Sequence, residues 1–235
     1  MPTRELMIPL GWIAQPFSSL THLLAALGLL LLIAWSLPRY RDRPLERRAL
    51  WVLLGGAGGM LVASGTYHAL APEHPLWMIF WHLDHASIWL GLAANLSSCT
   101  VLACPELAES NKKRVLWAVA IAGALLELCF LRQLPAFVSP LLYVGLGWLG
   151  LPLVLHMIRQ DGFWRGAPLL FGGLLASVGG VIDSQQWPHL VPRVFEAHEL
   201  MHSFTTTAQL CFLYTVWVSA REVACEDSSP LAPST

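Results

Sequence analysis

The chain has 235 residues, of which 55% are apolar and only 12% are charged, and its formal net charge at pH 7 is −1. A soluble domain of this length carries about 25% charged residues, so the composition indicates a membrane protein with several spanning segments. No basic segment interleaved with aromatic residues is present, and we expect no nucleic-acid partner. The five cysteines form no C-x-x-C pair, and we interpret them as small buried hydrophobic groups.

Long apolar runs along the chain predict an all-α, polytopic membrane protein, namely a seven-transmembrane-helix bundle forming a single domain over residues 1–235. The predicted helices cover, in chain order, residues 18–37, 49–70, 76–104, 115–131, 137–157, 166–186 and 194–220. Five residues in the second segment, GGAGG at 55–59, predict close approach of a neighbouring helix. Residues 221–235 form a polar tail that we expect to be disordered.

The basic residues of the predicted loops gather on one side of the membrane. Of the 14 Lys and Arg residues, only Arg4, Arg132 and Arg193 fall on the other side. Short loops rich in Lys and Arg stay in the cytoplasm, so this distribution predicts an outside N-terminus and a cytoplasmic C-terminus.

The last apolar segment opens with two histidines four residues apart, His198 and His202. On a helix they share one face, so both imidazoles can bind a single ion. The spacing also fits the H-E-x-x-H pattern of zinc proteases, in which Glu199 would be the general base. That protease takes a third ligand after the motif, and no histidine follows His202, so we expect Glu199 to face away from the metal and Glu196 to stabilise the helix N-terminus. Two hydrogen-bonded core histidines are the alternative interpretation.

Polar side chains from other helices are predicted at the same depth. Ser64 and His68 lie four residues apart at the end of the second helix, Asp84 lies near the start of the third, and His22 lies near the start of the first. Because successive helices run in opposite directions, these helix ends meet at one face of the membrane. Polar groups inside a membrane are costly, and they are usually functional or paired.

This layer predicts a zinc site, with one zinc per chain, formed by His68, His198 and His202 and with a fourth position open. Bound zinc would activate water and polarise a carbonyl group. Asp84 and Ser64 are the predicted catalytic residues: Asp84 would accept a hydrogen bond from the water or orient a ligand imidazole, and Ser64 would hydrogen-bond the water or the developing oxyanion. These parts suit hydrolysis of a lipid amide or ester that enters from the bilayer.

Further polar residues lie near this layer. We expect His22, His85 and Glu199 to support the site from behind the ligands, although His85 could also be a ligand. Glu127 lies well inside the bilayer, and its sequence context leaves open whether it is protonated, is paired with Gln133 or Arg132, or serves substrate access. Asp183, near the end of the sixth helix, could reach the same layer.

Four sequence motifs occur in a distinctive order, and they are PFSSLTHLLAALG at 16–28, SGTYH at 64–68, HLDHASIWL at 82–90 and HELMH at 198–202. Together they resemble the hemolysin III and progestin/adipoQ receptor family, within a superfamily of membrane metallohydrolases that includes the alkaline ceramidases. The resemblance covers essentially the whole seven-helix core. It implies zinc held by His68, His198 and His202, with supporting roles for Ser64 and Asp84. It also implies ceramidase-like amidase activity and a bacterial inner (plasma) membrane location.

The leading functional hypothesis is therefore a zinc-dependent hydrolase whose partners are membrane lipids and a lipid amide or ester. The alternatives are a receptor or sensor with a structural zinc, a pore-forming hemolysin, and a haem cytochrome with histidines from two helices. No amphipathic pore-lining face is evident, which disfavours the pore, and Ser64 and Asp84 beside the histidines favour zinc over haem. The sequence leaves the oligomeric state open.

Overall fold

The structure is a computed structural model that describes residues 7–108, 111–135 and 137–228, with side chains described as far as Cys225. In this part of the chain the regular secondary structure is helical, apart from two isolated β-bridges. The predicted all-α class is confirmed.

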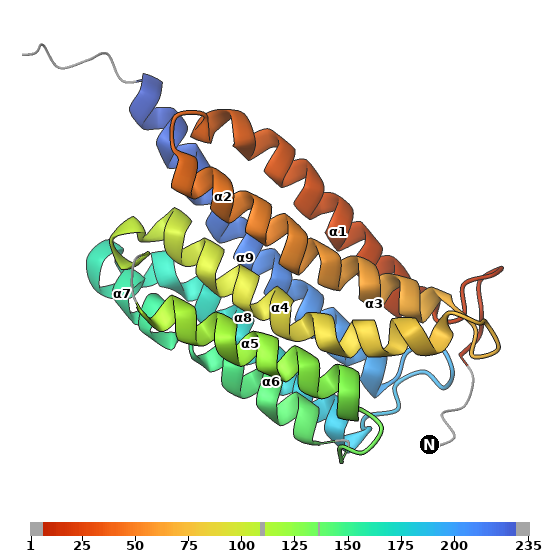
Figure 1. The fold of residues 1–235 in the computed structure, drawn as a ribbon. Coiled ribbons are helices and arrows are strands. Elements are labelled where there is room, and N and C mark those ends of the chain that lie inside the picture. Colours follow the sequence, from red (N-terminus) through yellow and green to blue (C-terminus); the bar gives the residue numbers. More distant parts are fainter. Residues whose placement is uncertain (1–6, 109–110, 136, 229–235) are drawn as a thin grey trace, which may run out of the picture.

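The helices form an elongated bundle whose members run roughly parallel or antiparallel to one another (Figure 1). The first half of the chain contains α1 (Pro16–Ser36), η1 (Leu37–Tyr40), α2 (Pro44–Leu53), η2 (Leu54–Gly58), α3 (Gly59–Ala69) and α4 (Trp77–Ala103). After the short turn η3 (Pro105–Leu107), the second half contains α5 (Asn111–Phe130), α6 (Val138–Trp148), α7 (Leu151–Asp161), α8 (Phe163–Gln185) and α9 (Ala197–Ser228). Because α2, η2 and α3 are continuous and α7 closely follows α6, these elements match the seven predicted segments in order.

Five of these segments are long and apolar enough to cross a membrane, and they are Pro16–Tyr40, Pro44–Ala69, Trp77–Ala103, Val138–Asp161 and Phe163–Gln185. Neither α5 nor α9 is among them. The first turn of α5 reads Asn-Lys-Lys-Arg, and α9 carries His, Glu, Thr and Gln side chains along its length. A multi-pass helical membrane protein is therefore confirmed, whereas seven crossings stay a prediction.

Two helices, α4 and α9, occupy the middle of the bundle. The former packs against α2, α3, α5, α6 and α9, and 67% of its most apolar stretch is buried. The latter packs against α1, α4 and α8, and Figure 1 shows it passing behind α4. Inside the bundle, the side-chain amides of Asn95 on α4 and Gln209 on α9 exchange two hydrogen bonds of 2.8 and 3.1 Å. This paired contact satisfies polar groups that would be costly to bury alone.

The glycine-rich stretch 55–59 lies where the second helical segment meets α4. A Cβ atom at Gly56 would be 2.3 Å from the Cβ of Ala94 and 3.0 Å from the backbone oxygen of Leu90. Only hydrogen fits in that space, which is the close approach that the sequence predicted. The chain here forms the wider π-type turn η2, a local variation that long helices tolerate in short pieces.

The last helix extends beyond the predicted boundary at residue 220. It continues to Ser228, so residues 221–228 are helical where the sequence predicted a disordered tail, and residues 229–235 lie outside the described part of the chain. Packing explains the difference: Val223 is buried in the main core cluster, and Glu222 accepts a 2.5 Å ion-pair contact from Arg165. These two contacts hold the helical extension against the bundle.

Candidate metal centre

The predicted polar residues are positioned by helix ends that meet at one end of the bundle. His68 lies in the last turn of α3, whereas His198 and His202 lie in the first two turns of α9. The start of α1 is fixed to the end of α3, because the backbone amide of Gln15 donates to the carbonyl oxygen of His68 (2.9 Å). The hydroxyl of Ser19 donates to the carbonyl of Gly65 (2.8 Å), which extends this contact along both helices.

The three histidines converge. One ring nitrogen from each of His68, His198 and His202 lies within 4.8 Å of the other two. The Nε2 atoms of His198 and His202 are 3.0 Å apart, and the ring centroids of His68 and His202 are 4.5 Å apart. Only 2% of His68 and 3% of His202 are exposed, whereas 17% of the His198 side chain is exposed, so the bundle encloses two of the three histidines and leaves the third partly accessible.

Each of the three imidazole rings is also held from behind through its Nδ1 atom. The three contacts join His68 Nδ1 to Oε1 of Gln15, His198 Nδ1 to Oδ1 of Asp183 (2.8 Å), and His202 Nδ1 to Nε2 of His22 (2.9 Å). Zinc-binding imidazoles commonly donate a hydrogen bond from the N–H of their second nitrogen to a carboxylate or another acceptor. This fixes the tautomer and directs the first nitrogen towards the metal. Three neutral imidazoles arranged in this way suit zinc, whose preferred ligands include histidine nitrogen.

Asp84 lies beside the histidine group, near the start of α4. Asp84 is only 8% exposed. Its carboxyl group interacts with the side chain of Ser64 and electrostatically with His198. His85 follows it in sequence, and its Nδ1 lies 3.6 Å from Oδ2 of Asp84 and 3.0 Å from the backbone oxygen of Trp81. The structure therefore places Ser64 and His85 around Asp84, and places none of these three among the converging ligand atoms.

Glu199 has a different neighbourhood. Its Oε2 accepts a hydrogen bond from the backbone amide of Glu196 (3.1 Å), and its Oε1 accepts one from the hydroxyl of Ser18 (3.3 Å). A glutamate in the third helical position that binds back to the residue before the helix is half of a capping box. Glu196 instead uses its carboxylate to accept a bond from the amide of Arg193 (2.8 Å). Glu199 thus caps α9 and joins it to α1.

Two residues that hold the rings differ in how visible they are in the sequence. Asp183 could reach the layer from its place near the end of the sixth predicted helix, and it contacts His198. Gln15 was not singled out, although it lies seven residues before His22, which is a spacing that returns to the same helix face. The sequence predicts a first helix that begins at residue 18, whereas α1 begins at Pro16, directly after Gln15. The shared face of Gln15 and His22 therefore could not be read from the sequence.

A second buried carboxyl group, that of Glu127, is connected to the neighbourhood of Asp84 through Tyr143. Glu127 on α5 is fully buried, and its Oε1 accepts a hydrogen bond of 3.0 Å from the hydroxyl of Tyr143 on α6. The same hydroxyl lies 3.1 Å from the backbone oxygen of His85, next to Asp84. No described residue hydrogen-bonds Oε2 of Glu127. Its partner is therefore Tyr143, a residue that the sequence did not connect with it.

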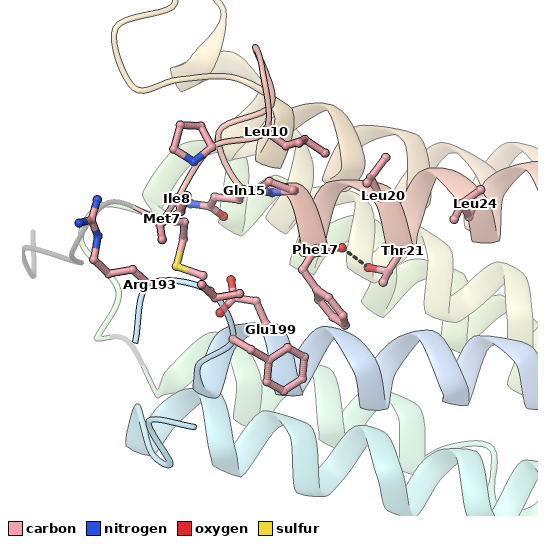
Figure 2. A pocket seen from close by; sticks show the side chains of 14 residues that line it. Met7, Ile8, Leu10, Gln15, Phe17, Leu20, Thr21, Leu24, Arg193 and Glu199 are labelled. Carbon is pink, nitrogen blue, oxygen red and sulfur yellow. Dashed lines mark hydrogen bonds between the residues drawn. The ribbon is translucent and has the colours of Figure 1, made fainter. Parts of the chain in front are cut away.

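A cavity of about 500 Å³ opens at the starts of α1 and α9, and Gln15, which contacts His68, lies in its wall (Figure 2). Its walls come from residues 7–10, from the first turns of α1, and from residues 193–199. Most of the lining is apolar, including Phe17, Leu20 and Leu24, but Gln15 and Glu199 also line it. Since Gln15 contacts His68, the cavity reaches the residues that support the histidine group.

The fold and the site together define a polytopic helical membrane protein with a candidate three-histidine metal centre at one end of its bundle. A model of the family described as haemolysin-III related matches residues 10–213. This match covers most of the chain and includes every residue named in the centre. The chain therefore belongs to the haemolysin-III related family, as the four motifs predicted.

Proposed function

We propose that this protein is a zinc-dependent membrane hydrolase that cleaves a lipid amide or ester. The observation that carries the proposal is the convergence of His68, His198 and His202, with the opposite nitrogen of each ring held by another side chain. Zinc bound by these three residues would supply Lewis-acid chemistry, because it polarises a carbonyl oxygen and makes water a stronger nucleophile. This donor set holds one zinc ion at the histidine centre.

In this proposal the acid–base work falls to Asp84. A carboxylate beside the ligand histidines can accept the proton of an attacking water and return it to the leaving group. Ser64 interacts with the Asp84 carboxyl group and thereby orients it. In place of that contact, the Ser64 hydroxyl could turn and donate its single hydrogen to the oxyanion that develops on the carbonyl. Neither role requires Glu199, which is engaged at the start of α9.

The cavity supports a lipid substrate. Its apolar lining suits an acyl chain, and its volume of about 500 Å³ falls in the range typical of small-molecule sites, about 300–1,000 Å³. Gln15, which contacts His68, and Glu199 provide polar groups in the lining (Figure 2). An amide or ester group placed there would lie next to the residues that hold the proposed ligands.

The test combines metal analysis with turnover on the detergent-purified full-length protein. We expect about one zinc ion at the histidine centre of the wild type, loss of that ion in His68→Ala, and retention in Asp84→Asn. Hydrolysis of a panel of lipid amides and esters should be lost in both variants. A wild type that contains no metal after gentle purification would exclude the mechanism. Zinc without turnover on any of these lipids would instead favour a receptor or sensor with a structural zinc.

We further propose that the histidine centre faces away from the cytoplasm. Basic residues gather at the opposite end of the bundle, in the α1–α2 loop, at the start of α5, around the α7–α8 junction and near the end of α9 (Figure 1). Because basic loops stay in the cytoplasm, this end would be cytoplasmic and the N-terminus would lie outside. A location in a bacterial inner membrane would be consistent with this arrangement.

A further inference from the structure

A second group of side chains that could hold a metal ion lies at the end of the bundle away from the three histidines. Cys104 directly follows the last turn of α4, Glu106 lies in η3, and His156 lies on α7. One potential ligand atom from each of the three lies within 4.8 Å of the other two. The Nε2 atom of His156 is 2.7 Å from Oε1 of Glu106. Thus residues about fifty positions apart in the chain bring sulfur, oxygen and nitrogen to one place.

The backbone holds this group in place. The amide of Cys104 donates to the carbonyl of Thr100 (2.9 Å), which continues α4, and the carbonyl of Cys104 accepts from the amide of Leu107 (2.9 Å). Pro105 restricts the intervening turn, since its ring fixes φ. Cys104 is only 2% exposed and belongs to the main core cluster, so the position of its sulfur is set by packing. The turn therefore presents Cys104 and Glu106 together to α7.

The surroundings favour a cation. Burial, followed by the charges of Glu106 and Asp161, raises the pKa of the Cys104 thiol to about 11, and Arg165 opposes this effect. A hydrogen bond from its own backbone amide, and then His156, lower the pKa of Glu106, so this carboxylate is ionised at neutral pH. Arg165 forms an ion pair with Glu222, in which its Nη2 atom lies 2.5 Å from Oε2 of the glutamate. Two acidic residues, Glu106 and Asp161, thus act on Cys104, whereas Arg165, the basic residue that acts on it, is paired with Glu222.

We propose that Cys104, Glu106 and His156 form a second metal site, which binds a divalent transition metal of the zinc type. Thiolate and imidazole ligands select zinc and its neighbours, whereas Mg²⁺ and Ca²⁺ require oxygen ligands. Three protein ligands leave a fourth position for water, as in zinc sites that keep an open coordination position. The site shares no residue with the histidine centre and does not depend on the proposed hydrolase activity.

Cobalt provides a direct test because a cobalt–thiolate bond has its own near-ultraviolet charge-transfer absorption. Chelator-stripped, full-length protein titrated with Co²⁺ should develop this band in the wild type and in His68→Ala. Cys104→Ser should lose it, while Cys211→Ser, which alters a half-buried cysteine on α9, should keep it. Glu106→Gln should retain the band but need a more than tenfold higher concentration of Co²⁺, because one ligand is removed.

Two results would overturn the proposal. The first is the absence of a thiolate band in the wild type, and the second is an unchanged band in Cys104→Ser. If Cys104→Ser does not fold, His156→Gln provides the second variant, and it should weaken Co²⁺ binding at the thiolate by more than tenfold. Unaltered Co²⁺ binding in His156→Gln would show that His156 is not a ligand and only contacts Glu106. A metal-free histidine centre would not affect either readout, because the His68→Ala variant already lacks that centre.

Discussion

The Nδ1 atom of His202 lies 2.9 Å from the Nε2 atom of His22, with the two rings edge to face and their centroids 4.4 Å apart. For His202 to bind a metal through Nε2, its Nδ1 must carry the proton and donate it to His22. His22 must then be neutral, with its own proton on Nδ1, which has no hydrogen-bond partner among the described residues. One histidine thus sets the tautomer of the other.

From this relationship we expect His22→Ala to weaken zinc binding at the histidine centre by about 10–100-fold, the usual effect of removing a partner behind a ligand. The measurement is competition with a chromophoric chelator. His82→Ala is the matched control, because His82 contacts the backbone oxygen of Met78 and lies outside the ligand group. Equal affinities in His22→Ala and the wild type would mean that His22 does not orient His202.

Glu199 should affect stability more than chemistry. Because it caps α9, Glu199→Ala should lower the free energy of unfolding by about 1 kcal/mol, as loss of a helix cap does. Glu199→Gln preserves hydrogen-bonding oxygen and should cost less. Both variants should keep zinc and turnover in elemental analysis and lipid hydrolysis assays. Loss of turnover in Glu199→Gln, with unchanged stability and zinc content, would instead support the general base of a zinc protease.

The buried Glu127 depends on the Tyr143 hydroxyl. Tyr143→Phe leaves Oε1 of Glu127 without this donor and should cost about 1–3 kcal/mol of stability, the penalty for an unsatisfied buried polar group. Tyr214→Phe is the control, since Tyr214 is 51% exposed. In a double-mutant cycle, combining Tyr143→Phe with Glu127→Leu should give a smaller loss than the sum of the two single losses. Additive losses would show that the two side chains are not coupled.

Two neighbouring glycines give a matched pair for helix packing. Gly56→Ala places a methyl group 2.3 Å from Ala94 Cβ, and we expect it to cost about 1–3 kcal/mol because α4 must move away. Gly59→Ala meets nothing within 4 Å and should be neutral or stabilising by up to about 1 kcal/mol. Thermal unfolding in detergent measures both. Similar melting temperatures for the two variants would contradict the close contact.

The orientation can be tested with single cysteines in a cysteine-free background. His189→Cys lies in the exposed segment between α8 and α9, at the histidine end, whereas Arg41→Cys lies in the α1–α2 loop. A membrane-impermeant maleimide should label His189→Cys in intact cells and label Arg41→Cys only after permeabilisation. The reverse pattern would place the histidine centre in the cytoplasm.

The sequence predicted the order of the helical segments and the ends that carry His68, His198 and His202. Both are local properties: apolar runs of about 20 residues mark the helices, and a four-residue spacing puts two histidines on one face. The contacts of Gln15 and of Tyr143 could not be predicted. They depend on how each helix is rotated about its axis, and in a membrane bundle the lipid-facing and core-facing sides are similarly apolar. Hydrophobic periodicity therefore does not fix that rotation.

Gln15 holds His68 in two ways, because its backbone amide bonds the carbonyl oxygen of His68 and its side chain contacts the imidazole. The same side chain forms part of the cavity wall. A molecule resting against Gln15 would push on the residue that sets both the backbone and the ring of His68. Gln15 thus connects the cavity with the imidazole of His68, so a molecule that fills the cavity would change the position of that ring.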